Sequence, residues 1–205
     1  MPEAAQPLAV ADTMETTLVE ESSLVGRCRA GDAAAFDALV ARHASVVYNL
    51  AYRMLGDPDD AEDAAQTAFI RAYTSIRAFR GGSSFGTWLY RIALNICLDQ
   101  LKSRRRQPEM VSELPETVTG APLAPPSDDP ESAVLRGERQ ELIQTAINSL
   151  PEAQRVVLVL SDLQGMTYEE IVEITGATLG TVKSRLNRAR ISLKVKLEQH
   201  LELLR

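Results

Sequence analysis

Apolar residues recur every three or four positions along most of the chain, which is the period of an α-helix. The clearest case is the segment 33–55, which Asp32 precedes and Gly56 follows. Asp is a good helix N-cap, and glycine commonly ends a helix. The apolar residues expected on the inner face of this segment are Phe36, Leu39, Val40, Val47, Leu50, Ala51 and Met54. The pattern predicts an all-α protein.

Three further helices are expected in the first half of the chain. One begins near Glu21 and ends at Gly31, after an acidic, weakly patterned stretch at residues 1–20 that predicts a disordered tail. Another is opened by Asp57-Pro58, an N-cap followed by proline at the first helical position. The third follows a loop at residues 80–84, and its inner stripe is expected to be Leu89, Ile92, Ala93, Ile96, Cys97 and Leu101.

The stretch 107–135 interrupts this helical pattern and divides the chain into two domains, 21–106 and 136–205. It holds six of the ten prolines, six acids and no base. Such a composition is typical of a flexible linker. As a coil it would span on average about 30 Å, and fully extended it could reach roughly 95 Å. It is either a tether that crosses a large partner or an inert spacer.

The second domain reads as a short series of helices. One covers residues 136–150, and a second starts at Pro151 and ends at Gly165. Thr167 and Glu170 then form a capping box that opens a short helix. A Gly176 turn and a cap at Thr178 lead into the last helix. Short helix, glycine turn and longer helix make the helix-turn-helix pattern.

Composition and charge narrow the class of protein. The 205 residues carry a net charge of −6, yet cations gather at residues 102–106 and 183–196. Local patches matter more than the total for nucleic-acid binding. Cys28 and Cys97 lie far apart, which argues against a disulfide framework and for a reducing cytosol. The N-terminal residues lack a signal-peptide pattern, and the apolar run 156–160 is too short to span a bilayer. A cytoplasmic protein is expected.

The helix opened by Asp57-Pro58 carries an acidic face. Negative charge in a first turn is favourable by about 0.3–1 kcal/mol per group, which accounts for one or two acids. Four acids and a glutamine exceed what capping needs, so we interpret the face as a docking surface for a basic partner. Its residues are Asp59, Asp60, Glu62, Asp63 and Gln66.

The stretch 79–106 combines a flexible glycine-serine loop, four aromatics and a basic helix end. Aromatics beside cations suit single-stranded nucleic acid, because each stacked base contributes about 1–3 kcal/mol. The alternative is that these aromatics belong to the core. Under the first interpretation the strand-contacting residues are Arg80, Ser84, Phe85, Trp88, Arg91 and Asn95.

The last helix has six cations and no acid between Thr181 and Lys196. A solvated surface helix normally mixes signs, whereas an all-basic helix after a glycine turn suits the major groove of DNA. Its inner stripe is expected to be Val182, Leu186, Ala189 and Leu193. The alternative is a basic amphipathic helix for a membrane or protein. The residues expected to contact DNA are Lys183, Ser184, Arg185, Asn187, Arg188 and Arg190.

Catalytic chemistry finds no support in the sequence. The carboxylates show no catalytic spacing, and His43 and His200 have no obvious partners. The chain lacks a phosphate loop, a dinucleotide glycine pattern and a metal-ligand cluster. We expect no enzyme activity, no cofactor and no metal.

With these motifs in order, the chain resembles bacterial RNA polymerase sigma factors of the extracytoplasmic-function group, which keep only sigma regions 2 and 4. The resemblance covers roughly residues 21–106 and 136–198. Residues 57–66 resemble the polymerase-docking segment, and residues 79–95 the segment that melts and reads the −10 promoter element. Residues 150–152, 165–171 and 180–190 resemble region 4 and its −35 helix.

This resemblance implies a non-enzymatic factor that binds core RNA polymerase and promoter DNA. It implies that the acidic face docks on the β′ clamp helices and that region 4 contacts the β flap. It places Lys183, Ser184, Asn187 and Arg188 in the −35 major groove, and the 80–85 loop with Asn95 on flipped −10 bases. It also implies an anti-sigma partner and a stress- or envelope-responsive role.

Two other classes of protein compete with this interpretation. A polymerase-independent helix-turn-helix regulator would not need the aromatic loop or the acidic linker. A recombinase or transposase would need a clustered carboxylate or nucleophilic site, which the sequence lacks. A regulator should bind its duplex operator alone, whereas a sigma factor should bind duplex promoter weakly until core polymerase joins it.

Overall fold

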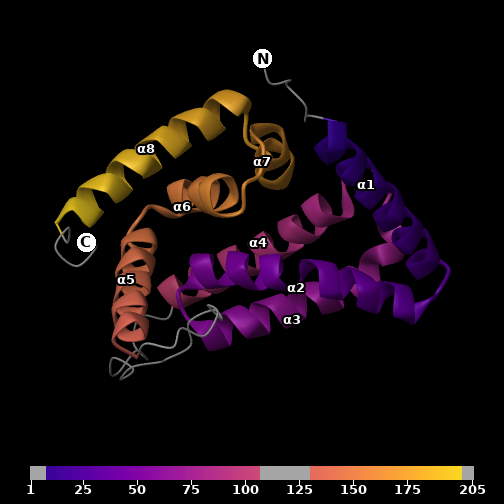
Figure 1. Cartoon of the computed structure of the whole chain (residues 1–205), viewed down its shortest axis with the longest axis horizontal. Helices are drawn as coiled ribbons and strands as arrows, with labels where there is room; N and C mark the ends of the chain where they lie inside the picture. Colours follow the sequence, from indigo (N-terminus) through magenta and orange to yellow (C-terminus); the bar gives the residue numbers. More distant parts are fainter. Residues whose placement is uncertain (1–7, 107–129, 200–205) are drawn as a thin grey trace, which may run out of the picture.

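The computed structural model describes residues 8–106 and 130–199, and within these ranges every regular element is helical (Figure 1). The first domain contains α1 Leu8–Arg29, α2 Ala33–Leu55, α3 Pro58–Ser75, the 3₁₀ turn η1 Ile76–Ala78 and α4 Phe85–Arg106. The second contains α5 Pro130–Asn148, α6 Glu152–Leu158, the π-helical turn η3 Val159–Leu163, α7 Tyr168–Thr175 and α8 Leu179–Glu198. The predicted all-α fold is confirmed.

The first domain is built on α2, α3 and α4, which pack against one another. The predicted caps are present, since Asp32 and Asp57 accept backbone hydrogen bonds from Ala35 and Asp60. Gly56 ends α2 with φ of 80°, and a Cβ there would collide with the Asn148 side chain. Glycine is therefore required at this position for its backbone conformation and for the close approach of α5.

Two helices begin earlier than expected. Helix α1 starts at Leu8, so the predicted disordered tail is wrong for residues 8–20; residues 1–7 lie outside the described ranges. The stretch from Leu8 to Val25 contains neither glycine nor proline, and the expectation gave too much weight to its acidity. Helix α5 starts at Pro130 rather than near residue 136, with proline at a helix start where its missing N–H costs nothing. The rest of the predicted linker, 107–129, is outside the described residues.

In the second domain α8 lies across α6 and also packs on α5 and α7. Thr167 and Glu170 form the predicted capping box, and Thr178 accepts a hydrogen bond from the Thr181 amide. Gly176 adopts φ of 67° between α7 and α8. The helix-turn-helix geometry therefore follows the local signals in the sequence.

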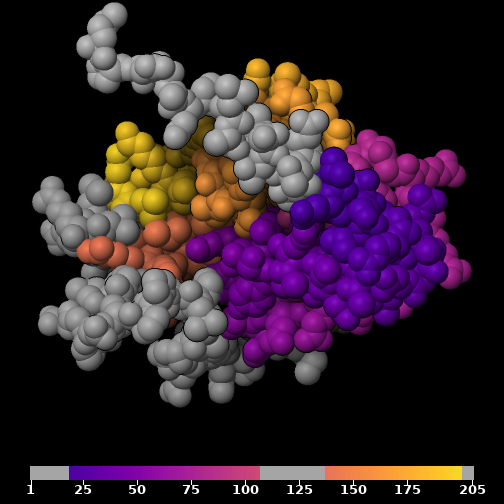
Figure 2. Space-filling model, turned by 45° about the vertical axis from the view of Figure 1, so that its right-hand side comes forward, coloured from indigo at the N-terminus to yellow at the C-terminus, as the bar shows by residue number. Residues whose placement is uncertain are grey.

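The two domains pack together. Helix α5 lies against α2, and in Figure 2 the salmon surface of α5 borders the purple surface of α2. Helix α7 packs against α4. The buried apolar residues of both domains form one continuous cluster. Gln144 of α5 is 4% exposed and donates to the carbonyl oxygens of Tyr52 and Arg53 at 3.3 Å each. The Arg53 guanidinium donates back to the Gln144 side-chain oxygen at 2.9 Å.

A membrane-spanning segment is not found in the described part of the chain, because none of its helices is both long enough and apolar enough.

Candidate nucleic-acid and polymerase interfaces

The 80–84 loop is fixed where it enters α4. The Ser84 hydroxyl accepts a hydrogen bond from the Thr87 amide at 3.0 Å and lies 2.8 Å from the Thr87 hydroxyl oxygen. Gly81 adopts φ of 73°, a conformation that suits glycine. Ser84 thus caps α4 and holds the loop beside the first turn of that helix.

The aromatics of this region form a cluster rather than an open stacking platform. Phe79 is 8% exposed and Phe85 is 3% exposed, so the interpretation of these two rings as surface aromatics is wrong in this structure. Their centroids lie 5.1 Å and 5.7 Å from that of Trp88, which is half-buried. The two phenylalanines pack against the indole at tilted angles, because large rings gain more from burial than from solvent contact.

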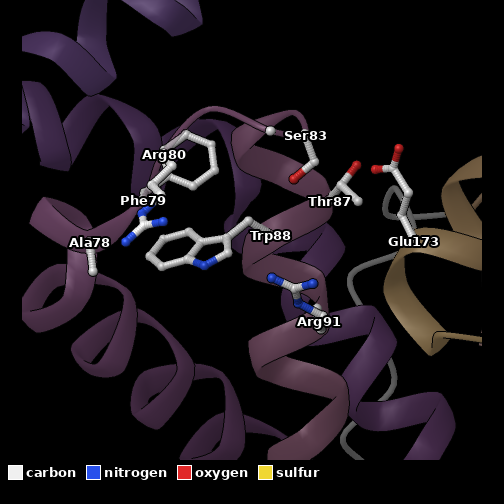
Figure 3. Close-up of a pocket in the computed structure, with 9 residues that line it drawn as sticks. Ala78, Phe79, Arg80, Ser83, Thr87, Trp88, Arg91 and Glu173 are labelled. Carbon is white, nitrogen blue, oxygen red and sulfur yellow. The ribbon is translucent and has the colours of Figure 1, made fainter.

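A cavity of about 470 Å³ opens beside Trp88 (Figure 3). It brings together three residues predicted to contact a strand, Arg80, Trp88 and Arg91, and it is also lined by Ala78, Phe79, Gly82, Ser83, Thr87 and Glu173. Ser84 and Phe85 do not line it. Asn95 is exposed further along α4. An indole with two guanidinium groups at one cavity can hold a base and its phosphate.

Glu173 is a cavity residue that the sequence did not indicate. It belongs to α7 of the second domain, and Figure 3 shows its carboxylate on the far side of the cavity from Trp88. Only the packing of α7 on α4 brings it there. An acid in this position repels a phosphate and offers a counter-charge to the cavity guanidinium groups.

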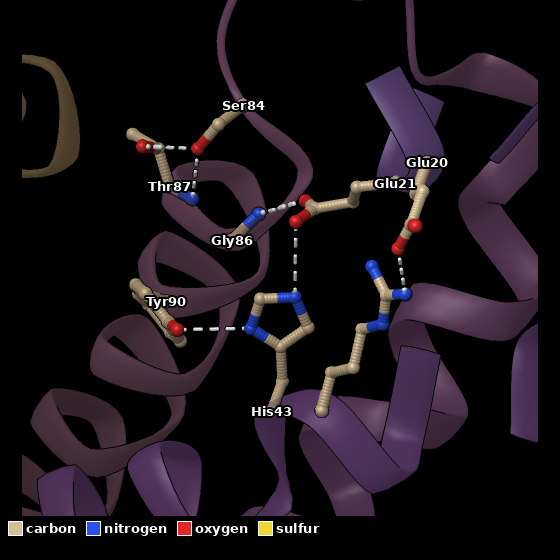
Figure 4. Close-up of polar contacts among 8 residues, drawn as sticks. Glu20, Glu21, His43, Ser84, Gly86, Thr87 and Tyr90 are labelled. Atoms are coloured by element: carbon tan, nitrogen blue, oxygen red, sulfur yellow. Dashed lines mark hydrogen bonds and ion pairs between the residues drawn. The ribbon is translucent and has the colours of Figure 1, made fainter. Parts of the chain in front are cut away.

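A buried polar network ties α1 to the start of α4 (Figure 4). The Glu21 carboxylate accepts a hydrogen bond from the Gly86 amide at 3.2 Å, and its other oxygen lies 3.6 Å from His43 Nε2. His43 Nδ1 shares a 2.9 Å hydrogen bond with the Tyr90 hydroxyl. The adjacent His43 ring lowers the pKa of Glu21, and burial raises the pKa of Tyr90 to about 12. Glu21 is therefore ionised and Tyr90 neutral near pH 7.

The predicted docking surface on α3 is largely open. Asp59, Glu62, Asp63 and Gln66 are exposed, and the Gln66 amide donates to Glu62 at 3.3 Å. Asp60 differs, because it is half-buried and forms an ion pair with Arg104 at the end of α4. Three carboxylates on one outer face leave a surface that favours a basic partner.

The exposed face of α8 presents most of the predicted duplex-contacting residues. Lys183, Ser184, Asn187 and Arg188 are exposed and Arg185 is half-buried, while Val182, Leu186 and Ala189 are buried as expected. The Lys183 ammonium lies 5.7 Å from the Tyr168 ring centroid.

Arg190 is already engaged within the protein. It makes a two-pronged contact with Asp162, at 2.8 Å and 2.6 Å, which lowers the pKa of that carboxyl. The positive charge of α8 is therefore partly neutralised by Asp162 of η3, a contact that the helix pattern alone did not reveal.

Within residues 8–106 and 130–199, no group of three or more histidine, cysteine or acidic side chains that could hold a metal ion is found. The described residues instead present a cavity lined by an indole and two guanidinium groups, and an exposed basic face on α8.

Comparison with known protein families finds a match for each of the two domains. The Sigma-70 region 2 family matches residues 39–107, and the Sigma-70 region 4 family matches residues 140–193. The chain belongs to the sigma-70 family, in its extracytoplasmic-function group. It is thus a sigma factor, which directs RNA polymerase to promoter DNA.

Relatives of this sigma factor extend over nearly its whole length. The RNA polymerase sigma-H factor of Pseudomonas aeruginosa is 37% identical over 89% of this chain and 96% of its own. The ECF RNA polymerase sigma-E factor of Escherichia coli is 38% identical over 85% of this chain and 93% of its own.

Two solved structures resemble the fold of this chain over most of its length. One is CnrH in complex with the cytosolic domain of CnrY, with a TM-score of 0.66 and 26% identity, covering 88% of this chain and 98% of that one. Another is the sigma factor RpoE in complex with the anti-sigma factor NepR from Bartonella quintana. It has a TM-score of 0.64 and 27% identity, and it covers 80% of this chain and 96% of that one.

Proposed function

We propose that the two surfaces described above divide promoter recognition between them. The cavity beside Trp88, with Arg80, Arg91 and the exposed Asn95, captures unpaired bases of the −10 element. The outward face of α8, through Lys183, Ser184, Arg185, Asn187 and Arg188, reads the −35 element as duplex. The observation that carries this division is the placement of Trp88 between two guanidinium groups at a cavity of about 470 Å³ in region 2.

Docking on core polymerase is assigned to the acidic face of α3. Asp59, Glu62 and Asp63 are exposed there and suit the basic surface of the β′ clamp helices, while Asp60 has its own partner in Arg104. The second domain is assigned to the β flap. Electrostatic complementarity of this kind speeds association and selects the partner more than it adds affinity.

Promoter binding requires the two domains to separate. The −10 and −35 elements lie roughly 25 base pairs apart, or about 85 Å at 3.4 Å per base pair. In this structure α7 packs directly on α4, so both reading surfaces belong to one body. Residues 107–129 could reach at most roughly 80 Å if fully extended, so the linker would cover most of this distance and the two domains themselves the remainder, once polymerase holds each domain.

Regulation by an anti-sigma factor is part of this proposal. The two similar solved structures are complexes, and one of them names an anti-sigma factor as its partner. A stress- or envelope-responsive role in the cytoplasm, without catalytic activity of its own, fits the extracytoplasmic-function group.

Transcription in vitro tests the proposal. Core polymerase and a pool of promoter fragments are transcribed with and without the protein. Transcripts that require the protein and share a −35 and a −10 element are expected. Absence of such transcripts, together with tight duplex binding by the protein alone, would favour the polymerase-independent regulator instead.

A further inference from the structure

The polar network of Glu21, His43, Tyr90 and the Gly86 amide begins and ends on α4 (Figure 4). The Tyr90 hydroxyl meets His43 Nδ1 of α2 at 2.9 Å, and His43 Nε2 faces the Glu21 carboxylate of α1. Glu21 then accepts from the Gly86 amide, which returns the network to α4. Residues four positions apart lie on one face of a helix. Helices α1 and α2 therefore hold the first turns of α4 from a single side.

The hydrogens of this network have one consistent arrangement. Glu21 is ionised and offers only acceptor oxygens, so the imidazole hydrogen of His43 belongs on Nε2, 3.6 Å from that carboxylate. His43 Nδ1 is then the acceptor for the Tyr90 hydroxyl. Each donor of the network thus faces an acceptor, and the His43 contact with Glu21 is the longest of the three.

Gly86 allows the His43 ring to approach the backbone of α4. A Cβ at position 86 would lie only 3.1 Å from His43 Cε1, which is tighter than ordinary van der Waals contact. The Phe85 ring centroid lies 5.5 Å from that of His43 and 5.7 Å from that of Trp88. His43 is therefore connected to Trp88 in two ways, through the backbone of α4 and through one intervening ring.

The proposed strand-reading residues lie on the other side of α4. Successive residues of an α-helix are rotated by about 100°, so Trp88, Arg91 and Asn95 point about 140–180° away from Gly86. Trp88 is half-buried, and Arg91 and Asn95 are exposed. The polar network thus holds α4 from behind and leaves its reading face free.

Stability alone does not call for a polar network at this place. Well-packed apolar side chains of similar shape often hold a core equally well. Directional hydrogen bonds add a defined geometry, because each group accepts its partner from only one direction. The geometry defined here is the position of the first turns of α4.

We propose that Glu21, His43 and Tyr90 are positioning residues for promoter opening, which fix the angle and depth at which Trp88 meets an unpaired −10 base. The inference rests on the proposed capture of that base beside Trp88. None of the three side chains touches the DNA in this proposal. They act through the backbone of α4 and through Phe85.

The double variant His43→Leu with Tyr90→Phe tests this role. It removes both polar partners together, so no buried nitrogen or hydroxyl is left unpaired and the fold is retained. Tyr48→Phe is the matched control, because it removes the same hydroxyl from a half-buried tyrosine of α2 outside the network. The conservative variant is His43→Gln, whose side-chain amide keeps a donor for Glu21.

Trp88 is the only tryptophan of the chain, so the fluorescence of the free protein reports its surroundings directly. We expect the double variant to shift this emission to longer wavelength. Permanganate reactivity of the −10 thymines should fall roughly tenfold, as for the loss of one stacked base. The denaturant midpoint and core polymerase binding should change little. His43→Gln should recover most of the opening, and Tyr48→Phe should match wild type.

Two results would overturn the positioning role while leaving the proposed function intact. One is a double variant whose Trp88 emission and promoter opening both equal those of wild type. The other is a loss of opening that only follows a loss of stability, with His43→Gln no better than the double variant. If wild-type protein opens no promoter, the proposed function fails instead, and the Trp88 emission still decides whether the network positions this side chain.

Discussion

The Arg155 guanidinium donates a hydrogen bond of 2.7 Å to the main-chain carbonyl oxygen of Met54, which joins α6 of the second domain to the end of α2. Arg155 is only 7% exposed and also donates to the carbonyl oxygens of Asn148 and Leu150. The last carbonyls of a helix have no partner within it. One side chain therefore satisfies carbonyls at the ends of α2 and α5, and separation of the domains removes only its contact with Met54.

Gln144 offers a cleaner test of the domain contact, because most of its hydrogen bonds cross to α2. Replacing it as Gln144→Ala should shift the equilibrium toward separated domains by about 1–2 kcal/mol, the contribution of one or two hydrogen bonds. Energy transfer between one dye on each domain measures that shift as a five- to thirty-fold change in population. Thr145→Ala, at the exposed neighbouring position, should leave the signal unchanged. Equal signals for both variants would show that the hydrogen bonds of Gln144 do not hold the domains together.

Asn95 is exposed on α4, beyond the cavity beside Trp88. Asn95→Ala should lower promoter opening by roughly ten-fold, as expected when a contact with a base edge is lost. Binding to core polymerase should not change, because the acidic face of α3 is untouched. Permanganate reactivity of unpaired thymines measures opening, and Ser103→Ala on the same helix is the control. A parallel loss of polymerase binding would contradict a role in reading the strand.

Arg188 and Arg190 lie two residues apart on α8 but differ in their partners. The structure shows no side-chain contact for Arg188, whereas Arg190 is held by Asp162. Arg188→Ala should reduce discrimination between −35 variants by about 1–3 kcal/mol at one base pair. Arg190→Ala should change stability or overall affinity but not the preference among variants. Binding of a −35 variant library by the polymerase complex distinguishes the two, and identical preferences for Arg188→Ala and wild type would refute base reading.

The Glu21 network predicts a dependence of stability on pH. Because the pKa of Glu21 is lower in the folded protein than its ordinary value, the carboxylate stabilises the fold above that ordinary value, near 4.5. This contribution disappears as the pH falls through the lowered pKa. Glu21→Gln should therefore cost about 1.5 kcal/mol of unfolding free energy at pH 7, the contribution of a hydrogen bond to a charged group. Denaturant titrations should show the difference from wild type shrinking toward pH 3, and a constant difference would exclude linkage to this carboxyl.

Local sequence signals predicted the helix boundaries well, because each signal depends only on residues within one helical turn. The N-caps Asp32, Asp57 and Thr178 and the capping box at Thr167 each act within one turn, and all appear in the structure. The expectation that α1 begins near Glu21 was wrong, because an acidic and weakly patterned composition does not by itself exclude a helix.

The site was less accessible from the sequence wherever it depends on contacts between distant segments. Single-residue patterns do not show whether Phe85 faces solvent or the cluster around Trp88, and its burial is decided by tertiary packing. Likewise, the pairing of Arg190 with Asp162 and the approach of Glu173 to the cavity beside Trp88 join residues that no periodicity relates.

Glu173 provides the last prediction, because its carboxylate lines the cavity proposed for a −10 base only while α7 packs on α4. Glu173→Gln removes the negative charge and should raise the affinity of the free factor for a single-stranded −10 oligonucleotide several-fold at low salt. The gain should fade as salt rises, since exposed charges are screened within about 10 Å at 0.1 M.

Glu169→Gln, exposed on the same helix but outside the cavity, is the control. Fluorescence anisotropy of a labelled oligonucleotide measures the affinity of both variants. With core polymerase bound the two variants should match wild type, because the separated domains no longer place α7 at the cavity; a Glu173→Gln gain that persists there would mean that α7 stays beside α4 during initiation.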